Sequence, residues 1–182
     1  TMTNSGYTGF QLSSWRPHCN ILVFTSNKRI LCRLSLLWGV KSFYYNKEAS
    51  TDKTIEHINK ILTKNGTPKK KITVLHCNSE YPTPFEDVNL KAINNIKKHL
   101  NVRIGYSDHT PGTTIALCST FYGSKVIEKH FTYDTTLEQS PDHKLSLNVN
   151  DFSNLVSQLR LSEISKGSEI RKDFDCESNA IK

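Results

Sequence analysis

The sequence lacks any Cys-x-x-Cys pair, and its five cysteines are odd in number and widely scattered. This pattern argues against a disulfide framework and against a zinc site. A reducing compartment is therefore expected, which predicts a cytoplasmic protein. A glycine-rich phosphate loop is also missing, because Gly105, Gly112 and Gly123 stand singly, as strand or turn glycines do.

A long uninterrupted apolar run is absent as well. The most apolar stretch, residues 21–45, is broken by four basic side chains: Lys28, Arg29, Arg33 and Lys41. A membrane-spanning helix requires roughly 20 predominantly apolar residues. The charged segment and the small-residue cleavage site of a signal peptide are also missing. We therefore expect no membrane partner.

The net charge of +7 would suggest a nucleic-acid partner, but the charge is unevenly distributed. Residues 1–50 hold six Lys or Arg and one acid, whereas the other 132 residues hold 18 basic and 16 acidic side chains. The basic cluster at residues 69–71 is most simply the solvated start of a strand. We therefore expect no nucleic-acid binding.

Helix and strand patterns alternate from residue 50 onward. The predicted order is a helix from about 50 to 64, a strand at 71–76, a helix at 86–100, a strand at 102–107, a helix at 113–122, a strand at 125–130 and a helix at 150–165. Short turns between such elements are typical of parallel βα units. These units need a closed barrel or a doubly wound sheet to cover both faces of the strands, so the predicted fold class is α/β.

Residues 1–49 do not share this alternation. They mix Trp, Pro, Cys and Arg without a sustained period of two or 3.6 residues. The predicted organisation is therefore an unassigned segment at 1–49, non-native or translated in a wrong frame, followed by one α/β domain at 50–182. The alternative is that the segment is a genuine extension that packs in its own way. If the segment is non-native, residues 1–46 should pack loosely and leave the first strand of that domain without a proper neighbour.

Polar residues cluster where each of the three predicted strands ends. In a β/α barrel, such strand ends converge on one mouth, where active sites are built. His109 and His130 follow neighbouring strands and could share a divalent cation, with water and substrate oxygens completing its shell. We expect their rings to face one cavity within about 10 Å of each other. The alternative is that both are hydrogen-bonded structural histidines.

Ser107, Tyr81 and Lys129 supply the hydroxyl and ammonium donors that a phosphate or carboxylate needs. Alternatively, the two hydroxyls serve loop backbone and Lys129 pairs with Glu128. In the loop after the third strand, Asp142 could accept hydrogen bonds from a sugar hydroxyl and His143 could carry a proton.

The Pro-Asp dipeptide at residues 141–142 is equally typical of an ordinary turn. Cys77 has no evident catalytic partner and is expected to be a small buried residue.

Four motifs together resemble the sialic acid synthase family, which includes the N-acetylneuraminate and N,N'-diacetyllegionaminate synthases. They occur in the order and approximate spacing of that family: His76-Cys-Asn-Ser-Glu-Tyr-Pro-Thr-Pro-Phe-Glu-Asp-Val-Asn-Leu90, Gly105-Tyr-Ser-Asp-His-Thr110, Val126-Ile-Glu-Lys-His-Phe-Thr132 and Pro141-Asp-His-Lys144. The resemblance covers about residues 50–182. It implies the C-terminal βα units of a TIM-type (β/α)8 barrel, which is partial because a complete barrel needs roughly 250 residues.

The resemblance also implies a reaction, in which carbon 3 of phosphoenolpyruvate attacks the open-chain aldehyde of an N-acylated hexosamine such as N-acetylmannosamine. Water then adds at carbon 2, and phosphate leaves with C–O cleavage. The implied roles are metal binding by His109 and His130, substrate binding by five residues and catalysis near the sugar by Asp142 and His143. The five substrate-binding residues are Ser79, Tyr81, Ser107, Glu128 and Lys129.

The implied cofactor is a divalent metal, Mn²⁺ or alternatively Mg²⁺ or Co²⁺, acting as a Lewis acid. Intact family members are expected to be homodimers. This chain departs from the family pattern in residues 1–49, in the absence of an antifreeze-like domain, and in a loop at 134–141 that is about one residue longer. A truncated fragment of such an enzyme, without turnover, is therefore the alternative to an active synthase.

The coding DNA upstream of Ser50 tests the expectation for residues 1–46. If the segment is translated in a wrong frame, one of the other two forward frames should encode an alternating βα pattern with the lysine-bearing strands of the family. Two frames without such a pattern would contradict the expectation.

Overall fold

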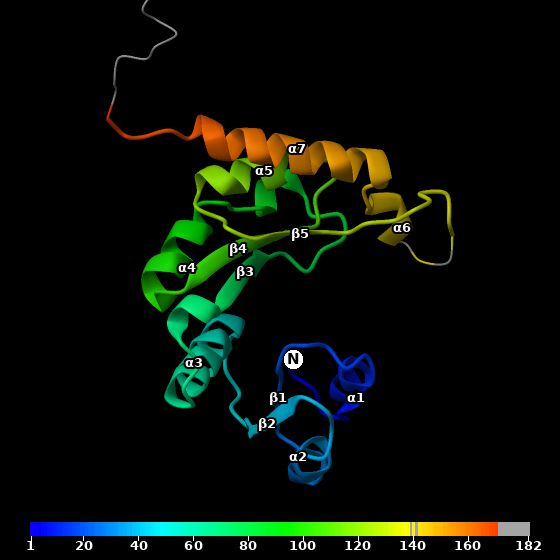
Figure 1. Ribbon diagram of the computed structural model, residues 1–182, viewed down its shortest axis with the longest axis vertical. Coiled ribbons are helices and arrows are strands. Elements are labelled where there is room, and N and C mark those ends of the chain that lie inside the picture. The colour runs from blue at the N-terminus through cyan, green and yellow to red at the C-terminus, as the bar shows by residue number, and fades with distance from the viewer. Residues whose placement is uncertain (139, 141, 171–182) are drawn as a thin grey trace, which may run out of the picture. The chain divides into compact units, whose positions relative to one another are not determined.

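The computed structural model describes residues 1–138, 140 and 142–170. The chain divides into two compact units, Thr1–His57 and Ile58–Lys182. Each unit has its own sheet, so each is described by itself (Figure 1). In the described part of the chain, no helix is both long enough and apolar enough to cross a bilayer.

The first unit is built on one parallel strand pair. Its elements are α1 (Tyr7–Ser14), β1 (Ile21–Thr25), α2 (Lys28–Leu34) and β2 (Val40–Tyr44). Ile21 lies opposite Val40 in the register. The side chain of Asn27 caps α2 by accepting from the amides of Arg29 and Ile30. The result is a complete βαβ crossover, the connection that parallel strands require.

The packing of this unit differs from the loose packing expected from the sequence. Val23 and Leu34 have no exposed surface and form a core with Ile21. β1 is buried along nearly its whole length, so its residues need no alternation of apolar and polar side chains. A search for a two-residue period therefore could not detect it.

The helix α3 (Thr51–Lys64) confirms the first predicted helix. The boundary between the compact units falls within this helix, between His57 and Ile58, rather than at residue 49.

The second unit contains a three-stranded parallel sheet. The order is β3 (Thr73–Cys77), β4 (Arg103–Asp108), β5 (Ile127–Lys129). Leu75 lies opposite Gly105, and Tyr106 lies opposite Ile127. The α-helices of this unit after α3 are α4 (Ala92–Leu100), α5 (Thr114–Phe121), α6 (Asp142–Leu145) and α7 (Val149–Ser165), with 3-10 turns at Lys69–Lys71 and Phe85–Asp87. Consecutive parallel βα units are confirmed.

One predicted helix begins later than expected. The apolar pattern predicted a helix from residue 86, but a 3-10 turn covers Phe85–Asp87 and α4 begins only at Ala92. Asn89 has a φ of 47°, in the left-handed region, which an α-helix cannot accommodate. Val88 is nevertheless buried, so the apolar pattern correctly marked its burial but not its backbone conformation.

α5 and α7 pack side by side against the sheet (Figure 1). Their shared core is formed by Ala116, Leu147 and Leu155, and Asn148 caps α7 by accepting from the amide of Asp151. Ile127 of β5 packs against this core, which therefore joins the helices to the sheet.

Two identical substitutions in α7 test this packing. Leu155 is 2% exposed and Leu161 is 64% exposed. We expect Leu155→Ala to lower the free energy of unfolding by about 2–5 kcal/mol, because it leaves a cavity beneath the helix. Leu161→Ala, the control, should change it by less than about 0.5 kcal/mol. Urea unfolding followed by circular dichroism measures both, and equal effects would contradict the observed packing.

Candidate functional site

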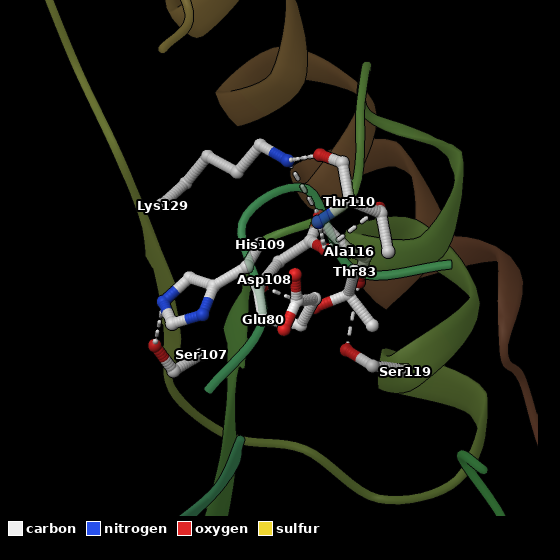
Figure 2. A network of polar contacts seen from close by, with 9 residues as sticks. All are labelled: Glu80, Thr83, Ser107, Asp108, His109, Thr110, Ala116, Ser119 and Lys129. Carbon is white, nitrogen blue, oxygen red and sulfur yellow. Dashed lines mark hydrogen bonds and ion pairs between the residues drawn. The ribbon is translucent and has the colours of Figure 1, made fainter. Parts of the chain in front are cut away.

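The candidate site lies at the carboxyl ends of β3, β4 and β5, which meet at one edge of the parallel sheet. Successive side chains point to opposite faces of a strand. Ser107 and His109 therefore share one face, and Glu128 and His130 share the corresponding face of β5. Figure 2 shows Ser107 and His109 lying together, while Asp108 is directed elsewhere.

The structure brings the two predicted histidines together. The ring centroids of His109 and His130 are 5.3 Å apart and their planes are inclined by 72°. This separation is within the expected limit. The Tyr81 ring stacks on His109 at 4.0 Å and meets His130 edge-on at 5.1 Å. The three rings form one cluster, drawn from the ends of β4 and β5 and from the loop after β3.

Hydrogen bonds define the tautomer of His109. Its Nδ1 lies 2.6 Å from the main-chain carbonyl oxygen of Asn78. A carbonyl oxygen can only accept, so Nδ1 carries the proton and Nε2 holds a lone pair. The Tyr81 hydroxyl donates to this Nε2 at 2.9 Å, and its oxygen is 3.3 Å from Nε2 of His130. The Nε2 atoms of both rings thus converge on the same oxygen.

This donor set fits a divalent cation only in part. Imidazole nitrogens bind first-row metals at roughly 2 Å, and both Nε2 atoms face one point. Among the residues that the structure describes, no group of three or more His, Cys, Asp or Glu gathers as a metal site. Two imidazoles are therefore the protein ligands available, which agrees with a shell completed by water and substrate oxygens.

Ser107 links the two strands on the site face. Its hydroxyl donates to Oε1 of Glu128 at 2.6 Å and lies 3.4 Å from Nε2 of His109. Ser107 is buried and Glu128 is exposed. The alternative in which the Ser107 hydroxyl bonds only to loop backbone therefore differs from the structure, because the partners of this hydroxyl are the side chains of Glu128 and His109.

Lys129 lies on the opposite face of β5 from Glu128. Its ammonium pairs with Oδ2 of Asp108 at 2.9 Å, and the two side chains are 2% and 0% exposed. It also donates to the carbonyl oxygen of Thr110 (Figure 2). The structure thus differs from the alternative in which Lys129 pairs with Glu128. It also encloses the ammonium that the resemblance assigned to substrate binding.

Negative charge gathers around the Tyr81 hydroxyl. Burial raises the pKa of this phenol, and Cys77, Asp142 and Glu128 raise it further by repelling the phenolate. Asp142, the first residue of α6, is exposed, and its effect on the pKa of Tyr81 indicates that its carboxylate lies near this phenol. Ser79 is exposed two residues after β3.

His143 is held by a buried threonine. The Thr132 hydroxyl donates to the carbonyl oxygen of Asp134 at 2.9 Å, so it accepts from Nδ1 of His143 at 2.8 Å. This leaves Nε2 of His143 as its basic nitrogen. Asp142 and His143 begin a short helix rather than an ordinary turn, and Pro141 lies outside the described residues.

Two residues of the site were not anticipated. Cys77 was expected to be buried, but it is exposed, with Sγ 3.8 Å from Nδ1 of His109. Asn78 orients His109 through its main-chain carbonyl, while its side-chain Oδ1 is buried without a hydrogen-bond partner. No sequence pattern marks a main-chain acceptor, because every residue type supplies one.

The NeuB family model matches residues 47–171, which is more than half of the chain. The chain belongs to the NeuB family. A second family model, the pyruvate kinase alpha/beta domain, matches residues 1–89, just under half of the chain.

Curated relatives support this membership. An N,N'-diacetyllegionaminic acid synthase of Campylobacter jejuni is 42% identical over 127 residues, covering 70% of this chain and 38% of the relative. The N-acetylneuraminate-9-phosphate synthase of Homo sapiens is 39% identical over 104 residues, covering 57% of this chain and 29% of the relative. The chain thus spans less than two-fifths of the length of either protein.

A solved structure supports the fold. The N-acetylneuraminic acid synthetase of Leptospira borgpetersenii superposes with a TM-score of 0.62 at 29% identity, covering 88% of this chain and 56% of that one. The predicted resemblance to sialic acid synthases and the predicted fold class of C-terminal βα units are both confirmed.

The tautomer of His109 can be measured directly. We expect ¹⁵N resonances of labelled histidine to show Nδ1 protonated and Nε2 unprotonated in His109, because the Asn78 carbonyl can only accept. His109→Gln assigns the signals, and Tyr81→Phe should shift Nε2 of His109 more than its Nδ1, because only Nε2 accepts from the Tyr81 hydroxyl. A proton on Nε2 of His109 at neutral pH would contradict the observed contacts.

Proposed function

We propose that this chain carries part of a sugar acid synthase site that condenses phosphoenolpyruvate with an N-acylated hexosamine such as N-acetylmannosamine. The observation that supports the proposal is the convergence of Nε2 of His109 and His130 on one oxygen atom, beside Ser107 and Glu128. Membership of the NeuB family places this cluster in a family of sugar acid synthases.

In this proposal, His109 and His130 hold a divalent cation, Mn²⁺ or alternatively Mg²⁺ or Co²⁺. Bound there, the cation would supply Lewis-acid polarisation of the sugar aldehyde. Asn78 keeps the Nε2 lone pair of His109 available because its main-chain carbonyl accepts a hydrogen bond from the protonated Nδ1. Ser107 holds the carboxylate of the exposed Glu128 beside the histidines.

The remaining residues would position the two substrates. Ser79, Tyr81 and Ser107 are proposed to line the phosphoenolpyruvate site, and Asp142 to accept a hydrogen bond from a sugar hydroxyl. His143, with Nδ1 bound to Thr132, could take a proton at Nε2. Carbon 3 of phosphoenolpyruvate bonds to the aldehyde carbon, water adds at carbon 2, and the bridging oxygen leaves with phosphate.

A fragment that retains this site without turnover is the second candidate. The observation that favours it is that only three strands supply the polar groups of the described site. Turnover needs several groups held in one geometry, and losing part of such a set removes most of the rate. The span of less than two-fifths of the curated relatives agrees with either candidate.

Calorimetry with Mn²⁺ tests the proposed metal ligands. We expect weak binding by the full chain and none by His109→Ala or His130→Ala, because each loses one of two imidazole ligands. His99→Ala is the matched control, since His99 is an exposed histidine on α4. Thermal unfolding confirms that each variant is folded. Equal Mn²⁺ affinity in a His109→Ala/His130→Ala double variant would remove the metal assignment.

Turnover separates the two candidates. The full chain is incubated with Mn²⁺, phosphoenolpyruvate and N-acetylmannosamine in ¹⁸O-water and analysed by mass spectrometry. An active synthase should yield a nine-carbon 2-keto acid and phosphate free of ¹⁸O, because water attacks carbon rather than phosphorus. Mn²⁺ binding without any keto acid would favour the second candidate, and labelled phosphate would contradict the proposed chemistry.

A further inference from the structure

A buried ion pair joins β4 and β5 directly behind the candidate site. Asp108 and Lys129 are register partners in the two strands. Their side chains are 0% and 2% exposed, and the charged atoms are 2.9 Å apart. Both residues immediately precede a site histidine, His109 or His130. The pair therefore joins the two backbone positions directly before those from which the rings project.

The carboxylate of Asp108 also spans His109. Its Oδ1 accepts from the main-chain amide of Thr110 at 2.9 Å and from the Thr110 hydroxyl at 2.8 Å. Its Oδ2 accepts from Lys129, whose ammonium donates in addition to the Thr110 carbonyl (Figure 2). The residues on each side of His109 are thus tied to one another and to β5.

Main-chain hydrogen bonds complete the constraint on both histidines. The carbonyl oxygen of His109 accepts from the amide of Thr83 at 3.0 Å, and that of His130 accepts from the amide of Leu147 at 2.9 Å. Thr83 and Thr110 are almost fully buried. The backbone at each histidine is therefore held on more than one side, and the ion pair joins the two strands at the register position directly before the histidines.

We propose that Asp108 and Lys129 are positioning residues that set the separation and orientation of His109 and His130. The metal-binding consequence rests on the proposed function, but the ring geometry does not. A pair that served stability alone could be replaced by neutral side chains of similar size without moving the rings, since buried ion pairs are often replaceable in this way. This difference makes the proposal testable.

The decisive variant is Asp108→Asn/Lys129→Met in the full chain. Either single change would leave one buried charge unpaired and would destabilise the fold, so the double change is preferred. We expect the double variant to remain folded by circular dichroism and to lose the nuclear Overhauser contact between the His109 and His130 ring protons. Its Co²⁺ affinity should fall at least about tenfold, as when groups that orient metal ligands are removed.

A surface pair provides the matched control. Arg160→Met/Glu163→Gln removes an exposed ion pair of the same 2.9 Å length from α7 and should change neither readout. If the full chain itself does not bind Co²⁺, the proposed function fails, while the ring contact still decides the positioning role. A folded Asp108→Asn/Lys129→Met variant with an unchanged ring contact would overturn the inference.

Thr110→Val is the milder variant if the double variant does not fold. It removes one donor to Oδ1 of Asp108 but keeps the ion pair and the main-chain amide donor. We expect a weaker ring contact and a Co²⁺ affinity lowered about threefold, a smaller loss than the tenfold or more for removing an orienting group outright. A folded Thr110→Val variant with the ring contact and affinity of the natural chain would overturn the inference by itself.

Discussion

Parallel pairing of β4 with β5 is the constraint on which the site depends. It places Ser107 opposite Glu128 and Asp108 opposite Lys129, so that one pair of partners faces the site and the next faces away. A shift of one residue would exchange the two faces and turn the polar site residues toward the interior. The two side-chain contacts, one on each face, are therefore a consequence of this register and also stabilise it.

The sequence predicted the three strands and the longer helices of the second unit because their periods are regular, but it did not predict the short helix α6. It predicted the meeting of His109 with His130 because parallel strands end at one edge. It could not predict the partner of Lys129. Glu128 is adjacent in sequence, but alternation along a strand separates neighbouring side chains, whereas Asp108 is distant in sequence and directly opposite in the sheet. The register between two strands that are distant in sequence cannot be derived from one amino-acid sequence alone.

The first unit shows the same limit in another form. β1 is apolar from Ile21 to Phe24, so it shows no two-residue alternation. The helices α1 and α2 are too short for a 3.6-residue period to be detected. Burial of Val23 and Leu34 depends on the crossover that joins β1 to β2. The two family matches overlap over residues 47–89, and the division between the two compact units, at His57 and Ile58 in α3, lies within this overlap.

The Tyr81 hydroxyl occupies the point at which the two imidazole lone pairs could meet. Any ligand that takes both nitrogens must first displace this phenol, so the site carries its own competitor. The free energy of binding such a ligand is then a difference. It equals the free energy gained from the bonds of the ligand to the two nitrogens, less that of the hydrogen bond and ring stacking that Tyr81 loses. Occupancy of both nitrogens would thereby be coupled to the position of the Tyr81 side chain.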